Sequence, residues 1–256
     1  MWRVVGCCRA TSNLSTKGVV RVNDDVTSLR LPNESATYRT SREALAKAEH
    51  GLVRAMEAVA AQRRALPPGG AVPENYRFTE GPSDLTQAGP LRAVTMDDLF
   101  GPHQTLLLYS FMYDGTGTPC RMCTSLIDGY DGAAADLAER VGFAVVAPAP
   151  VDDLRNYGVE RRWSNVRLVS SAGTSYGRDY GGMRADGELT SRMNVFTRRD
   201  GTIRHFYATE KGPTESGHDD RHLDLLWTLW GALDLTPEGR GDEWRPNRPA
   251  RRPFSA

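Results

Sequence analysis

The chain has 256 residues, of which 39% are hydrophobic and 25% are charged, ordinary values for a globular protein. It contains 32 Lys and Arg residues and 32 Asp and Glu residues, so its formal net charge is zero. A nucleic-acid binder usually carries a basic excess or a clustered basic face, so this balance argues against that class. No run approaches the roughly 18 apolar residues of a membrane span, and the apolar stretch after Met1 is too short for a signal peptide. We therefore expect a cytoplasmic protein with neither nucleic acid nor membrane as a partner.

The N-terminal part of the sequence predicts a loose arm followed by one long helix. Residues 1–28 show no hydrophobic periodicity and read as the arm, whereas residues 29–93 hold the helix and a connecting loop. The helix is predicted to begin at Thr40, with Glu43 at capping-box spacing, and to stop before Pro67. Its apolar residues recur at near-heptad intervals: Leu45, Ala48, Leu52, Met56, Val59 and Leu66. Such a stripe packs on its own domain or on a second subunit, so a homodimer through this helix is one expectation.

Residues 94–240 carry the pattern of an α/β domain, and residues 241–256 read as a C-terminal tail. A short strand at 76–79 precedes the domain, and a helical turn at 94–100 begins it. Strands are then predicted at 105–113, 143–147 and 166–170, helices at 120–140 and 151–163, a hairpin of 194–199 with 202–209, and a closing helix at 219–233. Alternating strands and helices predict right-handed crossovers and a parallel sheet. Asp200-Gly201 between two strand-like runs is a strong hairpin signal.

The order of these elements gives two of the four cysteines a special position. A buried strand leads into a loop that ends at Pro119, and Cys120 and Cys123 then stand in the first turn of a helix. Two residues between cysteines at a helix start bring both sulfurs within bonding reach. The backbone N–H groups and the helix dipole there stabilise a thiolate, and Arg121 adds a positive charge. A Cys-x-x-Cys pair beside a strand–helix–strand pattern is the signature of the thioredoxin layout.

Metal binding and an inert pair remain alternatives for these cysteines. Half a zinc site needs two more ligands, and His218 and His222 have ligand-like spacing but lie far along the chain. We expect no metal. We also expect no organic cofactor, because Gly115-x-Gly117 lacks the rest of a nucleotide-binding fingerprint.

Seven stretches of the sequence carry a family resemblance. They are Leu31-Pro-Asn-Glu-Ser, Gln62-Arg-Arg-Ala-Leu-Pro, Tyr109-Ser-Phe-Met, Pro119-Cys-Arg-Met-Cys-Thr-Ser, Leu168-Val-Ser-Ser-Ala-Gly, Asn194-Val-Phe and Leu235-Thr-Pro-Glu-Gly-Arg. Through them the chain resembles bacterial thioredoxin-like proteins grouped as domain-of-unknown-function family 899, over roughly residues 29–245. The resemblance implies a thioredoxin-like fold, a central mixed sheet flanked by helices, with an extra long N-terminal helix. It leaves function open, because a fold does not fix a function.

Two departures from the thioredoxin pattern concern the surroundings of the dithiol. Thioredoxins carry a cis-proline just before the hairpin, facing the dithiol, and that position, counted back from Phe196, is Ser191. They also carry a buried acid on the strand below the dithiol. We place Ser110 at that position, with Asp114 in the loop as a substitute candidate. The polar loop at 176–180 is a weaker candidate for facing the same site.

The preferred function is thiol–disulfide exchange by a thioredoxin-like redox protein. Cys120 attacks and Cys123 resolves, with Pro119, Arg121 and Ser191 as supporting residues, and the partner is a protein or small-molecule thiol or disulfide. The rival is a non-enzymatic interaction protein that keeps the fold. A peroxiredoxin-like peroxidase is less favoured. The reactive cysteine of a peroxiredoxin needs a Thr or Ser three residues before it to hold the peroxide. In this chain Gly117 occupies that position relative to Cys120.

Overall fold

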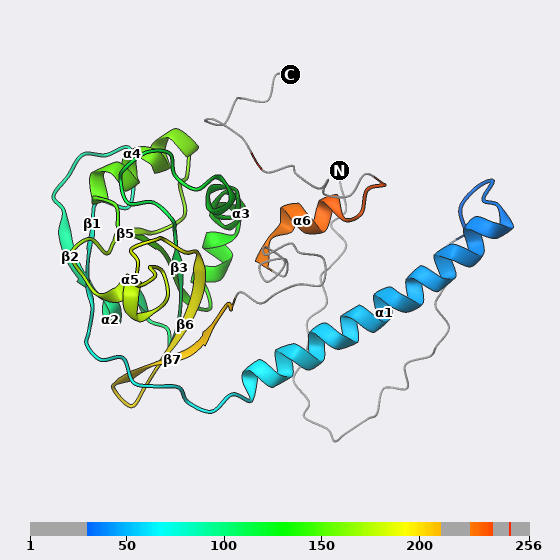
Figure 1. Ribbon diagram of the computed structural model, residues 1–256, viewed down its shortest axis with the longest axis horizontal. Coiled ribbons are helices and arrows are strands. Elements are labelled where there is room, and N and C mark those ends of the chain that lie inside the picture. Colours follow the sequence, from blue (N-terminus) through cyan, green and yellow to red (C-terminus); the bar gives the residue numbers. More distant parts are fainter. Residues whose placement is uncertain (1–29, 211–225, 238–245, 247–256) are drawn as a thin grey trace, which may run out of the picture. The chain divides into compact units, whose positions relative to one another are not determined.

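The computed structural model describes residues 30–210, 226–237 and Pro246 (Figure 1). The arm expected over residues 1–28, the start of the expected closing helix and nearly all of the expected tail lie outside the described residues. The chain divides into two compact units, Met1–Ala65 and Leu66–Ala256. In the described part, the first unit holds one long helix and the second holds the whole sheet.

The helix of the first unit, α1 (Ala36–Arg64), begins earlier than predicted. Ser35 is its N-cap, and the Ser35 side chain accepts a hydrogen bond from the backbone N–H of Tyr38 (3.1 Å). Thr40 lies inside the helix, where its hydroxyl donates to the Ala36 carbonyl oxygen (3.1 Å). The predicted start at Thr40 is therefore wrong. Serine is as good an N-cap as threonine, and here the helix begins after Ser35, five residues before Thr40.

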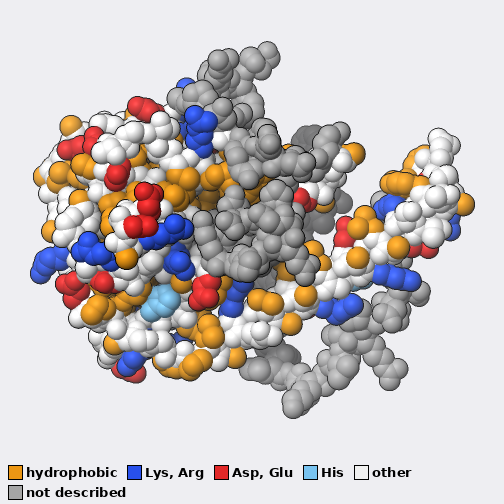
Figure 2. Space-filling view, viewed as in Figure 1, with side chains coloured by type: hydrophobic (Ala, Val, Ile, Leu, Met, Phe, Trp, Pro, Cys, Tyr) orange, Lys and Arg blue, Asp and Glu red, His pale blue; other side chains and the backbone are white. Residues whose placement is uncertain are grey.

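Large apolar side chains of α1 are exposed. Four of them recur every seven residues: Tyr38, Leu45, Leu52 and Val59. Figure 2 shows hydrophobic side chains along the length of this helix, with charged side chains between them. A seven-residue repeat on one side of a helix is the pattern of a coiled-coil seam.

The second unit is built on one seven-stranded sheet with the order β2-β1-β5-β4-β3-β6-β7. The strands are β1 (Arg77–Glu80), β2 (Arg92–Thr95), β3 (Thr105–Ser110), β4 (Gly142–Ala147), β5 (Leu168–Ser170), β6 (Arg192–Arg199) and β7 (Thr202–Ala208). β3, β4 and β5 run parallel, and β6 pairs antiparallel with both β3 and β7. Asp200 and Gly201 form the predicted hairpin turn, both with positive φ (51° and 71°). The fold is thioredoxin-like α/β, as expected.

The sheet also contains a hairpin that the sequence reveals only in part. β1 and β2 pair antiparallel along their full lengths, and β1 meets the sheet through Thr79 and Ser170. The sequence predicts only the first of these strands and assigns residues 29–93 to a segment outside the α/β domain. The structure instead places both strands in the sheet of that domain. β2 escapes prediction because two of its four residues are exposed and it has no apolar run.

Helices flank both faces of this sheet (Figure 1). They are α2 (Met96–Leu99), α3 (Arg121–Ala138), α4 (Val151–Arg161), α5 (Tyr176–Asp179) and α6 (Thr228–Leu233). Because side chains alternate along a strand, each face carries its own hydrophobic cluster. Tyr109 and Phe111 belong to the cluster that contains residues of α3, α4 and α6, and Leu106 and Leu108 belong to the other. We call these the dithiol-side cluster and the opposite cluster.

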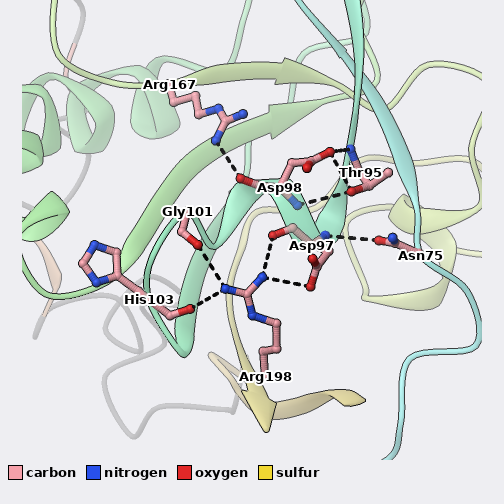
Figure 3. A network of polar contacts seen from close by, with 8 residues as sticks. All are labelled: Asn75, Thr95, Asp97, Asp98, Gly101, His103, Arg167 and Arg198. Atoms are coloured by element: carbon pink, nitrogen blue, oxygen red, sulfur yellow. Dashed lines mark hydrogen bonds and ion pairs between the residues drawn. The ribbon is translucent and has the colours of Figure 1, made fainter. Parts of the chain in front are cut away.

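A polar network fastens α2 to the sheet (Figure 3). The Arg198 guanidinium, from β6, donates to the Asp97 carboxylate (2.9 Å) and to the carbonyl oxygens of Gly101 and His103 (3.0 Å each). Thr95 caps the helix in a complete capping box with Asp98. The segment between β2 and β3 is therefore tied to the turn end of the β6–β7 hairpin. This contact fixes where β3 enters the sheet.

Candidate functional site

Cys120 is the N-cap of α3, so its side chain stands where the helix presents unpaired backbone N–H groups. The Cys120 N–H donates to the Met112 carbonyl oxygen (3.2 Å), which ties the loop back to the end of β3. The Cys120 carbonyl oxygen accepts from both the backbone N–H and the hydroxyl of Thr124 (2.9 Å each). Pro119, which precedes it, is buried. The predicted strand–loop–helix placement of the pair is thus present.

The two cysteines differ in burial and are directly connected. Both are present as thiols; Cys120 is partly exposed, and Cys123 is only 2% exposed. The backbone N–H of Cys123 donates to Cys120 Sγ over 3.4 Å. The hydrogen bond between the two side chains, together with burial, raises the pKa of the Cys123 thiol well above its usual range. A partner molecule can reach Cys120, and the protonated Cys123 lies behind it.

The strand residue that faces the dithiol is Tyr109, and the placement of Ser110 below the dithiol is wrong. Tyr109 is 1% exposed and lies in the dithiol-side cluster together with Cys123. Ser110 points to the other face of the sheet, where it lines a cavity beside Tyr176. The alternation of side chains along β3 explains the difference, because a shift of one residue exchanges the two faces. The apolar run of β3 gave no sign of this register, so the sequence reasoning missed Tyr109.

Burial raises the pKa of the Tyr109 phenol well above its usual range, and the nearby Cys123 and Cys120 sulfurs add to this effect. The Ser191 hydroxyl acts on the same phenol in the opposite direction. Ser191 is itself buried, and it directly precedes β6, whose residue Met193 pairs with Tyr109. Ser191 thus directly precedes the strand that pairs with β3 at Tyr109, and its hydroxyl acts on the Tyr109 phenol.

The other candidates lie away from the two sulfurs or on the surface. The Asp114 carboxylate accepts from the backbone N–H and the hydroxyl of Thr116 (2.8 and 2.7 Å), and these bonds lower its pKa. It therefore stabilises its own loop and is a poor proton acceptor for the dithiol. Arg121 is exposed in the first turn of α3.

The polar loop at 176–180 does not face the dithiol. Tyr176 belongs to the opposite cluster, and its ring meets Tyr76 and Phe78 edge to face (5.6 and 5.4 Å). A cavity of about 340 Å³ lies beside this loop, and Ser110, Tyr176 and Arg178 are among its lining residues. The cavity opens at the carboxyl edge of the parallel strands, but its lining includes neither cysteine.

Among the described residues, no three His, Cys, Asp or Glu side chains group closely enough to hold a metal ion. His218 and His222, the candidate metal ligands, lie outside the described residues. In the same described ranges, no helix is long and apolar enough to cross a bilayer.

These features define a thioredoxin-like α/β protein with a dithiol at the start of the helix that follows the central strand. The chain belongs to a family of bacterial proteins of unknown function, DUF899, whose sequence pattern matches residues 29–253. No curated protein matches the chain.

Several solved structures follow a similar chain course. Thioredoxin peroxidase I of Plasmodium yoelii is 15% identical with a TM-score of 0.42, covering 66% of this chain and 91% of its own. Peroxidoxin BcpB of Mycobacterium tuberculosis is 18% identical with a TM-score of 0.40, covering 66% and 98%. The lipoprotein thioredoxin Etrx1 of Streptococcus pneumoniae is 11% identical with a TM-score of 0.39, covering 60% and 98%.

Proposed function

We propose that this protein carries out thiol–disulfide exchange through Cys120 and Cys123. The observation that carries the proposal is the hydrogen bond from the Cys123 backbone N–H to Cys120 Sγ at the N-cap of α3. A backbone donor and the positive end of a helix dipole both favour a negatively charged sulfur there. Cys120 is also the more exposed of the two thiols, so it is the one that meets a partner.

The exchange takes two steps. The Cys120 thiolate bonds to one sulfur of a substrate disulfide, and the other substrate sulfur leaves as a thiolate. Cys123 then loses its proton and bonds to Cys120 Sγ, and the sulfur still held by Cys120 leaves and takes up a proton. Two electrons pass to the substrate, and the protein keeps a Cys120–Cys123 disulfide. The substrate class is a protein or small-molecule disulfide.

Three neighbours shape this reaction. Pro119 is buried and fixes the entry of the chain into α3, and the exposed Arg121 adds positive charge near Cys120. Ser191 replaces the proline that docks substrates in thioredoxins, so we expect efficient activation of Cys120 but weak docking and slow turnover. A substrate that needs only the reactive sulfur, such as a small disulfide, is favoured over an extended peptide.

The test compares two variants of the full chain, Cys123→Ser and Cys120→Ser, by iodoacetamide alkylation between pH 5 and 10. The variant that keeps Cys120 should react faster at neutral pH, because Cys120 is accessible and placed to be ionised. Faster reaction of the variant that keeps Cys123 contradicts the proposal. Failure of glutathione disulfide to oxidise Cys120 and Cys123 of the native sequence to a disulfide also contradicts the proposal.

Two other functions make different predictions. A non-enzymatic interaction protein, which Ser191 favours, would keep its partner when both cysteines are replaced by serine. A peroxidase would be oxidised by hydrogen peroxide far faster than an ordinary thiolate. Gly117 offers no hydroxyl to hold the peroxide, so we expect no such acceleration.

A further inference from the structure

The hydroxyl of Tyr109 is a buried polar group inside a hydrophobic cluster. The Tyr109 ring packs in the dithiol-side cluster, as a phenylalanine ring would, but its hydroxyl is buried there too. Within the described residues this hydroxyl has no hydrogen bond of normal geometry. A buried hydroxyl without a partner is costly, so its presence in a core position needs an explanation.

The polar groups around the Tyr109 hydroxyl are those of the candidate site. Cys123 and Cys120 act on it from α3, and Ser191 acts on it from the segment that precedes β6. That segment is held in place, because the Thr190 N–H donates to the Gly182 carbonyl oxygen (3.0 Å) and the Thr190 hydroxyl donates to that of Gly181. The Tyr109 hydroxyl is therefore within reach of both Ser191 and Cys123, the sulfur that resolves the mixed disulfide in the proposed exchange.

We infer that Tyr109 is a positioning residue for the resolving step. Its hydroxyl donates a hydrogen bond to Cys123 Sγ while that sulfur carries negative charge, and the Ser191 hydroxyl orients the phenol. This inference rests on the proposed exchange reaction. It assigns to a neutral phenol the place below the dithiol where thioredoxins have a carboxylate. A phenol cannot take the proton of Cys123 as a carboxylate can, so the two devices differ in mechanism.

The directions of the pKa shifts of Tyr109 and Cys123 support the Tyr109 hydroxyl as the hydrogen-bond donor. The phenol stays protonated because burial and the two sulfurs raise its pKa. The proximity of the Tyr109 hydroxyl in turn lowers the pKa of Cys123, against the effects of Cys120 and of burial, which raise it. Besides Cys120 and Tyr109, the backbone of Met112 also acts on Cys123 and lowers its pKa. In the resolving step the Cys123 proton ends on the departing substrate sulfur, and Tyr109 keeps its own proton throughout.

The test uses Tyr109→Phe, with Tyr176→Phe as the matched control. Tyr176 is also 1% exposed and its hydroxyl is also buried, but it lies in the opposite cluster. Both substitutions remove one buried oxygen and leave the ring, so a general effect on packing appears in both. Thermal unfolding of both variants checks that each is folded.

The first readout is independent of exchange activity. In a Cys120→Ser background, the pH midpoint of Cys123 alkylation is followed by mass spectrometry. Tyr109→Phe should raise this midpoint by about one pH unit, a tenfold smaller thiolate fraction below the midpoint, and Tyr176→Phe should leave it unchanged. Equal midpoints for the two variants overturn the inference, whether or not the protein exchanges disulfides.

The second readout separates the two steps with 5,5′-dithiobis(2-nitrobenzoate), a small aromatic disulfide. Attack by Cys120 releases one coloured thiolate, and resolution by Cys123 releases a second. Tyr109→Phe should slow the second release about tenfold and leave the first unchanged. A protein of native sequence that releases neither contradicts the proposed exchange, whereas a Tyr109→Phe variant with normal second release contradicts only the role of Tyr109.

Discussion

His205 is a histidine whose surroundings favour its neutral form. It is half-buried in β7, and burial together with the nearby Arg192 lowers its pKa below the usual 6.5. Its Nε2 lies 3.2 Å from Asn194 Oδ1, and the Asn194 amide nitrogen donates to the Tyr180 carbonyl oxygen (3.1 Å). Nε2 therefore donates to Oδ1, which fixes the tautomer of the neutral ring.

This lowered pKa makes the free energy of unfolding depend on pH. As the pH falls through about 6.5, the unfolded chain binds the proton first, so the stability that His205 contributes at pH 7 is lost towards acid. The expected result is that His205→Gln shows a smaller fall in urea midpoint between pH 7.5 and 5 than the native sequence. His50→Gln, at an exposed position of α1, is the control. An unchanged or steeper acid dependence in His205→Gln would contradict this assignment.

At the same scale, the sequence predicts where the two cysteines stand in the fold but not what surrounds them. Cys120 and Cys123 follow from spacing alone, because a Cys-x-x-Cys at a helix start has few other structural reasons. Tyr109 could not be predicted, since its role depends on which face of β3 it occupies, and a continuous apolar run does not reveal that register. The position of Ser191 opposite the dithiol, counted back from Phe196, stays a prediction, and β6 pairs with β3 without a bulge.

At the scale of elements, two glycines ten residues apart, Gly132 and Gly142, have opposite effects on the structure. A side chain at Gly142, the first residue of β4, would overlap the Leu99 carbonyl oxygen and come within 3.0 Å of Phe100 Cα. A side chain at Gly132, within α3, would meet nothing within 4 Å. Gly142 therefore lets the chain of β4 pass close to the end of α2, whereas Gly132 only weakens a helix.

Alanine substitutions should separate these two cases. Gly142→Ala should lower the free energy of unfolding by about 1–3 kcal/mol, because backbone atoms must move. Gly132→Ala should raise it by about 0.5–1 kcal/mol, because alanine restricts the unfolded chain and favours the helix. Urea denaturation of the two variants and the native sequence measures both. Equal effects, or stabilisation by Gly142→Ala, would show that the close passage of β4 and α2 is not as described.

Element boundaries were predicted less well than element types. The alternation of apolar runs and helical patterns was enough to give the order of strands β3 to β7. The start of α1 and the strand β2 were not predictable, because several residues can cap a helix and a four-residue edge strand has little hydrophobic pattern. The error at α1 is a choice between two local caps, whereas the error at β2 lies where strand pairing, rather than local sequence, decides the structure.

At the scale of the whole molecule, the sheet and both of its hydrophobic clusters belong to residues after Ala65. A chain that begins at Leu66 should therefore keep its cooperative unfolding, with a midpoint within about 4 °C of the full chain, and should keep the alkylation behaviour of Cys120. Differential scanning calorimetry and the alkylation assay check this. Loss of a cooperative transition would show that the first unit is needed to fold the second.

Sedimentation of both chains shows whether α1 mediates self-association, which its seven-residue repeat predicts.

The division of the interior into two clusters also has a spectroscopic consequence. Trp163, Trp227 and Trp230 all lie in the dithiol-side cluster with Cys123, whereas the aromatic rings of the opposite cluster are those of Tyr and Phe. Tryptophan emission from the described residues therefore originates on one side of the sheet only. Trp2 and Trp244 lie outside the described residues, and replacing both with phenylalanine leaves a protein whose indole fluorescence comes solely from the side that holds the thiols. In such a protein, oxidation of the dithiol and unfolding of its cluster can be followed optically without an added label.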